Sequence, residues 1–372
     1  MKYYIIAGEA SGDLHGSNLM KALIKQDVDA DFRFWGGDLM EAVGGTLVKH
    51  YKERSFMGFA EVILNLRKIF GLIKFCKTDI ATYQPDVIIF IDNSGFNLRI
   101  AKWAKQENYK THYYISPQVW ASRASRVEKI KRDIDEMYVI LPFEEEFYKS
   151  YNYDVHFVGH PLIDAIADRS QVDEYKFRAE HGLNEKPIIA LLPGSRKQEI
   201  IKMLSVMLSV VKDFTDYQFV IAGAPSQDYE FYQQFIKTNN VAFVSNETYD
   251  LLSISTAALV TSGTATLETA LFKVPQVVCY KANAISYHIA KRIITLKFIS
   301  LVNLIMDKEV VTELIQGDLN TKQLKQELNL ILDESHREQL YLDYYELEQK
   351  LGGKGASDKA AQLIYNCLTK SN

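Results

Sequence analysis

Cysteine is scarce in this sequence of 372 residues. The three cysteines, Cys76, Cys279 and Cys367, lie far apart and form no CxxC pair, which favours buried thiols in a reducing compartment over a disulfide framework or a zinc site. No run reaches the roughly 18 apolar residues of a membrane-spanning helix. The first apolar run stops at Gly8 and Glu9, too early for a signal peptide. We therefore expect a cytoplasmic protein.

No charge of one sign dominates, since lysine and arginine total 43 against 47 for aspartate and glutamate. This balance gives no indication of a nucleic-acid partner. The sequence also lacks HExxH and any compact His/Cys cluster, so we expect neither a metal nor a cofactor. Segment 27–31 has the DxD spacing of some metal-dependent sugar transferases, but it precedes a predicted strand. We interpret it as a solvated connection at the wrong end of the sheet for a ligand.

What the sequence does contain is a series of short apolar runs with helical segments between them, typical of parallel sheets covered by helices. Strands are predicted near residues 3–7, 32–35, 87–91, 112–115, 137–141 and 155–158, and again near 188–192, 218–222, 241–244, 257–260 and 276–279. Two consecutive sets predict an α/β protein with two Rossmann-like domains, 1–165 and 166–350. Ser357 is a suitable N-cap for a last helix, within 355–372, that is expected to pack back on the first domain.

Ligands of open α/β sheets bind beyond the carboxyl ends of the strands, so the strand-to-helix turns are the candidate sites. The first turn follows strand 3–7, and we expect its helix to begin near residue 15. Its glycines allow close backbone approach, and a helix start offers free N–H groups to an anion. A plain capped turn is the alternative. We predict a site for a polyhydroxy, phosphorylated ligand formed by Gly8, Glu9, Ser11, Gly12, Asp13 and His15.

Two turns in the second half have a similar character. In the turn 192–196, Ser195 and the backbone amides can hold phosphate oxygens while Arg196 binds them bidentately. In the turn 262–268, small residues open a helix and Glu268 can reach ribose hydroxyls. Either turn alone also fits a structural cap. Together they predict a nucleoside-diphosphate site formed by Ser195, Arg196, Ser262, Gly263, Thr264 and Glu268.

Asp92 ends the apolar run 87–91 and is the candidate general base. An aspartate at the carboxyl end of a buried strand points to the ligand edge, and partial burial raises its pKa toward working pH. An Asx turn that caps the strand is the alternative interpretation.

Segment 57–77 has apolar residues at helical spacing with basic residues beside them. Periodicity alone favours a core-facing helix. A broad apolar face with basic flanks also fits a helix lying on an anionic membrane surface, and segment 291–302 has a similar composition. The predicted membrane contacts are Phe59, Leu66, Ile69, Phe70 and Ile73.

An ordered series of short motifs, running almost the whole length, resembles the lipid-A-disaccharide synthase family. The matching positions are 7–13 with His15-Gly16, Met57-Gly58, Glu61-Val62, Asp92, Phe96-Asn97, Ser116-Pro117, Trp120-Ala121, Arg123, Arg126-Val127, 141–144, 159–162, 192–196, 262–268, Asn303, Glu313, Gln316 and Gly355-Ala356-Ser357. Four residues depart from the pattern, namely Ser94, Ser122, Val302 and Thr312. They bear on loop shape and acyl-chain preference.

The resemblance implies a glycosyltransferase of the GT-B type, with two facing Rossmann-like domains, the acceptor on the first and the donor on the second. It implies a metal-independent, inverting transfer of diacylglucosamine from UDP to diacylglucosamine 1-phosphate, giving a β-1,6-linked disaccharide. It assigns Asp92 as base, places the opening turn with Glu9, Ser11 and Asp13 on the acceptor side, and adds Asn303 to the UDP side. It also implies a peripheral location on the inner face of the cytoplasmic membrane.

The alternatives are another UDP-sugar enzyme of this fold, such as a UDP-N-acetylglucosamine epimerase or a peptidoglycan transferase, and a non-catalytic binder of lipid or nucleotide sugar. An epimerase needs acids and a histidine around the donor sugar in the second domain, and the sequence shows no such cluster. The sequence leaves the oligomeric state open.

Overall fold

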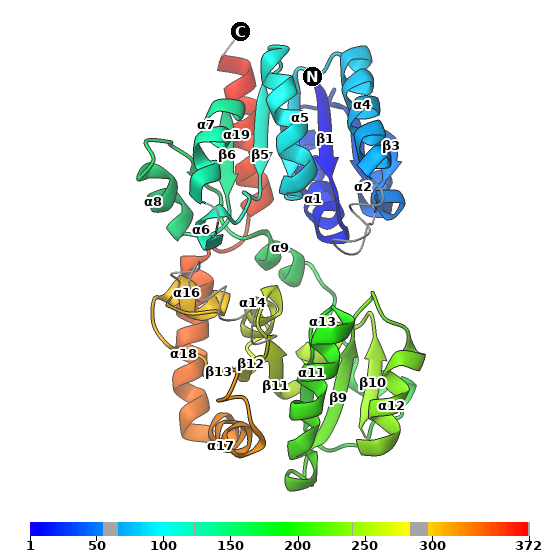
Figure 1. Cartoon of the computed structure of the whole chain (residues 1–372), viewed down its shortest axis with the longest axis vertical. Helices are drawn as coiled ribbons and strands as arrows, with labels where there is room; N and C mark the ends of the chain where they lie inside the picture. Colours follow the sequence, from blue (N-terminus) through cyan, green and yellow to red (C-terminus); the bar gives the residue numbers. More distant parts are fainter. Residues whose placement is uncertain (55–65, 123, 240, 283–296, 371–372) are drawn as a thin grey trace. The chain divides into compact units, whose positions relative to one another are not determined.

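The computed structural model describes residues 1–54, 66–122, 124–239, 241–282 and 297–370. The chain divides into two compact units (Figure 1). Unit 1 combines Met1–Asp164 with Leu351–Asn372, and unit 2 is Ala165–Lys350. Unit 1 is therefore built from two separate stretches of chain, with unit 2 between them in the sequence.

Unit 1 contains a parallel sheet that has seven strands among the described residues, in the order β3-β2-β1-β4-β5-β6-β7. The strands are β1 Lys2–Ala7, β2 Asp31–Gly36, β3 Thr46–His50, β4 Val87–Ile91, β5 Thr111–Tyr114, β6 Glu136–Val139 and β7 His156–Phe157. The α-helices are α1 Ala10–Gln26, α2 Asp38–Val43, α4 Leu66–Tyr83, α5 Ser94–Gln106, α6 Val119–Ser122, α7 Val127–Asp133, α8 Phe143–Lys149 and α19 Ala356–Lys370, and α9 Pro161–Ala167 runs across the unit boundary. Two 3₁₀ turns are η1 Tyr51–Arg54 and η2 Ala124–Arg126.

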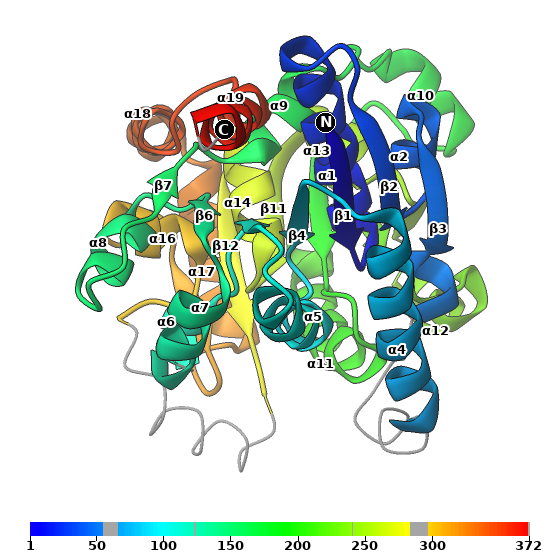
Figure 2. The same ribbon diagram turned by 90° about the horizontal axis from the view of Figure 1, so that it is seen from above.

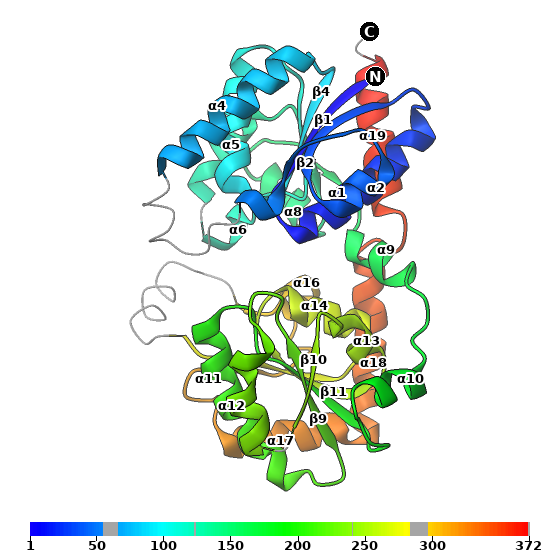
Figure 3. The same ribbon diagram turned by 90° about the vertical axis from the view of Figure 1, so that its right-hand side faces the viewer.

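The central strands of unit 1 are buried on both faces, which is why they are continuous apolar runs. Alternate residues point to opposite faces. Tyr3, Ile5 and Ala7 join one core cluster with α1 and α19, while Tyr4 and Ile6 join another with α4, α5 and α7. Figure 3 shows α4 and α5 on one side of the sheet and α1 and α19 on the other.

The last helix packs on unit 1, as the sequence predicts. Its apolar face places Ala360, Ala361, Ile364 and Leu368 in the same core cluster as residues of α1 and β1. Two hydrogen bonds fix its start, because the Asp164 carboxylate accepts from the backbone N–H groups of Gly355 at 2.7 Å and Ser357 at 3.3 Å.

Unit 2 contains a second parallel sheet, which has six strands among the described residues, in the order β10-β9-β8-β11-β12-β13. Its strands are β8 Ile188–Leu192, β9 Gln218–Gly223, β10 Ala242–Ser245, β11 Ser255–Thr261, β12 Gln276–Tyr280 and β13 Glu313–Ile315. Its helices are α10 Glu174–Glu180, α11 Lys197–Met207, η3 Leu208–Asp213, α12 Tyr229–Asn239, α13 Thr248–Ser253, α14 Thr264–Leu271, α16 Leu301–Met306, α17 Thr321–Leu332 and α18 Glu334–Lys350. The two sheets confirm the predicted α/β architecture, with β3 and β13 as edge strands that the apolar runs did not reveal.

Candidate active site

The opening turn contacts the turn that carries Asp92. Strands β1 and β4 are neighbours, with Ala7 paired to Ile91, so their carboxyl ends lie side by side. A Cβ atom on Gly8 would lie 2.0 Å from Nδ2 of Asn93, which leaves room only for glycine at this position. The structure therefore brings the opening turn and the Asp92 turn, which were predicted separately, together at one edge of the sheet.

The first helix begins earlier than the sequence predicts. Glu9 is the N-cap with an extended backbone, φ −147° and ψ 169°, and α1 starts at Ala10 instead of near residue 15. The prediction was wrong because Ser11 and Gly12 were interpreted as turn residues, whereas both belong to the first turn of the helix. Ser11 is exposed there, and the side chain of the N-cap residue Glu9 makes no capping hydrogen bond.

The Asp13 carboxylate is engaged within the fold. It accepts hydrogen bonds from the backbone N–H groups of Gly37 at 2.7 Å, Leu39 at 3.0 Å and Met40 at 3.1 Å. It thereby provides acceptors for the free N–H groups at the start of α2. The residue is only 3% exposed. Its bonds are those of a cap, although for α2 and not for its own helix.

Two buried histidines lie close together beneath the opening turn. Burial lowers the pKa of His15 to about 4, and burial together with the nearby His15 lowers the pKa of His160 to about 3. His160 Nδ1 accepts a hydrogen bond from the Leu162 N–H at 3.2 Å. His15 Nδ1 is buried and has no partner among the described residues. Both rings are neutral near pH 7, so neither contributes a charge to bind phosphate.

Asp92 has an uncommon backbone conformation. Its φ is 45° and that of Asn93 is 43°, so two successive non-glycine residues are left-handed directly after β4. The Asp92 carbonyl accepts hydrogen bonds from Asn97 Nδ2 at 2.8 Å and from the Tyr113 hydroxyl. Such conformations cost free energy and cluster at functional sites. The buried Asn97 and Tyr113 side chains hold this one in place.

The surroundings of the Asp92 side chain raise its pKa. Partial desolvation is the main cause, and the negative charge of Glu9 adds to it. The side chain is still solvent-exposed and thus accessible to a substrate. An accessible carboxylate with a raised pKa is what a general base requires.

In unit 2 both predicted phosphate turns line one cavity of about 240 Å³. They follow β8 and β11, which are adjacent in the sheet. Gly194 has φ +96° and a Cβ there would lie 2.4 Å from Glu199, so the turn requires glycine. Of the predicted residues, the lining includes Ser195, Ser262, Gly263, Thr264 and Glu268.

Arg196 is not among the residues that line this cavity, and Glu199 is. Arg196 is the exposed N-cap of α11, while the Glu199 carboxylate accepts a hydrogen bond from the Ser195 N–H at 3.3 Å. The sequence analysis missed Glu199. An acid at the third position of a helix is the signal of a capping box, and here it reaches the N–H of the residue before the N-cap.

Glu268 is oriented by a residue that the sequence analysis did not single out. The Tyr249 hydroxyl donates to Glu268 Oε1 at 3.0 Å, and Tyr249 in turn stacks under the guanidinium of Arg169. Burial raises the pKa of Glu268, and the Tyr249 hydrogen bond partly opposes that rise. Thr248, next to Tyr249, lines the cavity.

Asn303 has no polar atom left for a ligand. Its side-chain oxygen accepts from the N–H groups of Val310 at 2.8 Å and Val311 at 3.0 Å, and its Nδ2 donates to Glu313 at 2.9 Å. Glu313 also accepts from the Ile299 N–H, whose carbonyl accepts from the Ser262 hydroxyl at 2.8 Å. Asn303 is fully buried and does not line the cavity, but this chain of bonds links it to Ser262, which does.

The predicted membrane-contact residues differ in their surroundings. Phe59 lies outside the described residues, and Leu66 is the first residue of α4. Ile73 is buried in the core and Ile69 packs against it. Phe70 is 62% exposed, on another side of the same helix. The apolar stripe of α4 therefore serves the core in part, and only its outer part is available to other contacts.

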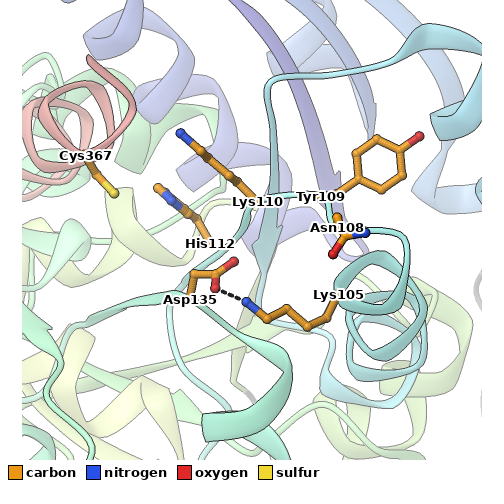
Figure 4. A pocket seen from close by; sticks show the side chains of 7 residues that line it. All are labelled: Lys105, Asn108, Tyr109, Lys110, His112, Asp135 and Cys367. Carbon is orange, nitrogen blue, oxygen red and sulfur yellow. Dashed lines mark hydrogen bonds and ion pairs between the residues drawn. The ribbon is translucent and has the colours of Figure 1, made fainter. Parts of the chain in front are cut away.

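A further cavity of about 340 Å³ lies at the opposite, amino-terminal end of β5 and β6 (Figure 4). It contains the ion pair of Lys105 with Asp135, and also His112, whose Nε2 has no hydrogen-bond partner in the part of the chain that the structure describes. Because ligands of such sheets bind at the carboxyl ends of the strands, we do not take this cavity as the candidate active site. Within the described ranges, no three His, Cys, Asp or Glu side chains are placed to hold a metal ion, and no helix is long and apolar enough to cross a membrane.

Comparison with known proteins decides the family. The family model described as lipid-A-disaccharide synthetase matches residues 3–366. The lipid-A-disaccharide synthases of Syntrophus aciditrophicus and Geobacter metallireducens are 39% and 36% identical to the chain, over 99% and 98% of its length and 98% and 97% of theirs. The chain belongs to the lipid-A-disaccharide synthetase family.

Solved structures support the fold of this lipid-A-disaccharide synthetase family member. A putative UDP-N-acetylglucosamine 2-epimerase from Listeria monocytogenes superposes with a TM-score of 0.69 at 13% identity, covering 100% of this chain and 97% of that one. The calicheamicin glycosyltransferase CalG4 gives 0.58 at 14% identity, covering 100% and 98%. At such identities the likeness shows the GT-B fold alone.

Membership of the lipid-A-disaccharide synthetase family settles the class of activity. The protein is a glycosyltransferase that acts in the synthesis of the lipid A disaccharide. The epimerase alternative is not favoured, because the epimerases resemble this chain in fold and only at low sequence identity.

Proposed function

We propose that the enzyme joins UDP-2,3-diacylglucosamine to 2,3-diacylglucosamine 1-phosphate, with the acceptor bound by unit 1 and the donor by unit 2. The observation that carries this assignment is Asp92, an accessible carboxylate of raised pKa on a backbone held by Asn97 and Tyr113. The cavity of unit 2, with two strand-to-helix turns, suits the diphosphate of the donor.

The chemistry follows from these groups. The Asp92 carboxylate takes the proton of the acceptor 6-hydroxyl while that oxygen attacks C1 of the donor sugar from the face opposite UDP. The bond from C1 to the UDP oxygen breaks, and its electron pair stays on UDP. Ser195, Thr264 and the first amides of α14 stabilise the departing diphosphate, and Glu268 binds ribose hydroxyls. The product is a β-1,6-linked disaccharide with inverted configuration at C1.

The direct test supplies both acylated glucosamines in detergent micelles and measures disaccharide and UDP together. Equal amounts of the two products support the proposal. Release of UDP in the absence of the acceptor, or a new UDP-sugar without a disaccharide, would contradict it.

We also propose that the enzyme works on the anionic inner face of the cytoplasmic membrane, since its substrates carry acyl chains. Phe70 and Phe75 are 62% and 48% exposed on α4, with the exposed Lys74 between them. An aromatic and basic surface of this kind binds anionic bilayers.

The membrane proposal is tested with a double variant, Phe70→Ser with Phe75→Ser, which is expected to bind phosphatidylglycerol vesicles more weakly than the wild type does. Leu342→Ser is the matched control, because Leu342 is 64% exposed in unit 2. Equal vesicle binding by all three proteins would rule out α4 as the contact.

A further inference from the structure

Unit 1 has a basic pocket whose lining includes Ser94, two residues after the candidate base Asp92. It has a volume of about 380 Å³, and its lining residues come from the start and middle of α5 and from the segment formed by η2 and α7. Helices α5 and α7 pack against each other (Figure 2). The residues that line it are Ser94, Gly95, Leu98, Arg99, Lys102, Arg126, Lys129, Arg132 and Asp133.

Four of the lining cations have no ion-pair partner among the described residues, namely Arg99, Lys102, Arg126 and Lys129. The fifth, Arg132, is bonded to Asp133 at 2.6 Å, so the one acid of the lining is already neutralised. The pocket therefore carries a concentrated positive charge in a protein whose net charge is −4.

The spacing of these cations costs stability. Arg99 and Lys102 are three residues apart on α5, and Arg126 and Lys129 are three residues apart at the start of α7. Like charges at this spacing destabilise a helix, and here two such pairs line the same cavity. Among the described residues no ion pair with an acidic side chain offsets the repulsion of these four cations, whereas a bound anion would.

The position of the pocket relates it to the reaction. Helix α5 begins at Ser94, two residues after Asp92, and its first turn adds the positive end of a helix dipole. With a rise of about 1.5 Å per residue, Lys102 lies roughly 12 Å along the helix from Ser94. The lining residues of α5 thus begin two residues after the candidate base and continue along the helix over a length comparable to one sugar ring with a phosphate.

We propose that this pocket binds the phosphate monoester of the acceptor, which deepens the proposed function and rests on it. Lysine and arginine together bind a phosphate by charge-assisted hydrogen bonds. Binding the phosphate here orients the sugar ring so that its 6-hydroxyl is presented to Asp92. The pocket would then select a phosphorylated acceptor over its dephosphorylated form.

The test compares the wild type with a double variant that carries both Lys102→Gln and Arg126→Gln. Each is assayed with the acylated glucosamine 1-phosphate and with the same acceptor lacking phosphate, in nonionic micelles. The ratio of kcat/KM for the two acceptors is expected to fall by about tenfold or more in the variant, since two charge-assisted contacts are lost. The KM for the donor is expected to stay unchanged.

The matched control removes two cations elsewhere in unit 1, Lys21→Gln with Lys110→Gln, and is expected to keep the wild-type ratio. An unchanged ratio in the pocket variant would overturn the inference. So would a loss of binding to phosphatidylglycerol vesicles with the ratio unchanged, because the pocket would then bind phospholipid headgroups. If the wild type forms no disaccharide with either acceptor, the proposed function fails instead.

Discussion

At the scale of single residues, Asp92 combines an exposed carboxylate with a left-handed backbone conformation that is held by hydrogen bonds from buried side chains. The sequence predicted its place at the end of a strand, because buried apolar runs end in polar residues at the ligand edge. It gave no sign of the left-handed backbone at Asp92 and Asn93. That conformation depends on Asn97 and Tyr113, which are 5 and 21 residues away in the sequence.

Asp92→Asn should lower kcat by about 100-fold or more while leaving the affinity for UDP intact, since the amide cannot accept the proton. Steady-state rates and calorimetry with UDP measure the two quantities. Asp29→Asn is the control, because Asp29 is exposed at the other end of the sheet. A variant that keeps its rate would remove Asp92 as base.

The raised pKa of Asp92 also sets the pH dependence of the rate. The base must be ionised, so kcat/KM should fall as the pH drops through its pKa, at a higher pH than for an ordinary aspartate. A profile of kcat/KM against pH checks this. A fall that begins only near pH 4 would contradict it.

The raised pKa of the buried Glu144 leads us to expect a separate effect of pH on the stability of the fold. Its carboxylate accepts from Ser116 and from the N–H groups of Ile140 and Leu141, yet burial raises its pKa to about 7. The folded state therefore binds a proton more tightly than the unfolded state, whose pKa is near 4.5. Stability should be lost as pH rises from about 4.5 through 7, by up to about 3 kcal/mol.

Urea unfolding of the wild type and of Glu144→Gln at pH 5 and pH 8 measures this effect. The glutamine carries no charge, so the difference in free energy of unfolding between the two proteins should change with pH in favour of the variant at pH 8. A difference that does not depend on pH would show that Glu144 is ionised in the folded state.

At the scale of the elements, the turns after β1 and β4 depend on each other. Gly8 leaves the space that the Asn93 side chain occupies, and this contact joins residues 85 positions apart in the sequence. The sequence identified both turns from their glycines and polar residues. It did not pair them, because the order of strands in a sheet is set by packing and not by position in the chain.

Gly8→Ala should destabilise the protein by about 1–3 kcal/mol and reduce activity, because a Cβ would meet Asn93 at 2.0 Å. The double variant Gly8→Ala with Asn93→Gly removes the clash and suits a φ of 43°, so it should recover most of the stability. Thermal unfolding and the transferase rate report both effects.

Gly71→Ala is the matched control for this pair. Gly71 lies in α4 with open space around its Cβ position, so alanine there should be neutral or stabilise by up to about 1 kcal/mol. Equal losses from Gly8→Ala and Gly71→Ala would show that the contact with Asn93 is unimportant.

The same scale shows where sequence patterns fall short in unit 2. The two glycine turns identified most of the cavity lining, because the chemistry of a phosphate site depends on local residue types. Asn303 was assigned by resemblance only, and its bonds to Val310, Val311 and Glu313 depend on a tertiary packing that no local pattern encodes.

At the scale of the whole molecule, unit 1 depends on a helix that follows unit 2 in the sequence. Ser357 and the apolar spacing predicted the start and the buried face of α19, whereas its packing on unit 1 was an inference that no local pattern encodes. Ile364 is fully buried in the core cluster that contains β1 and β4 residues.

Ile364→Ala should cost about 2–5 kcal/mol, and the loss should be confined to unit 1. Hydrogen exchange followed by mass spectrometry on the full chain should show faster exchange in β1 and β4 and unchanged exchange in β8 and β11. Leu342→Ala, at an exposed site, is the control. Faster exchange throughout both sheets would mean that the units unfold together.

The order of synthesis follows from this arrangement. The ribosome releases all of unit 2 before α19 appears, so unit 2 can fold while the nascent unit 1 still lacks a helix of its core. During that interval the apolar surface that α19 will cover is open to solvent and to chaperones. Leu19 and Leu23 of α1 belong to the same core cluster as α19. Translation must proceed past residue 364 before the core beneath the strand that leads to Asp92 can be completed.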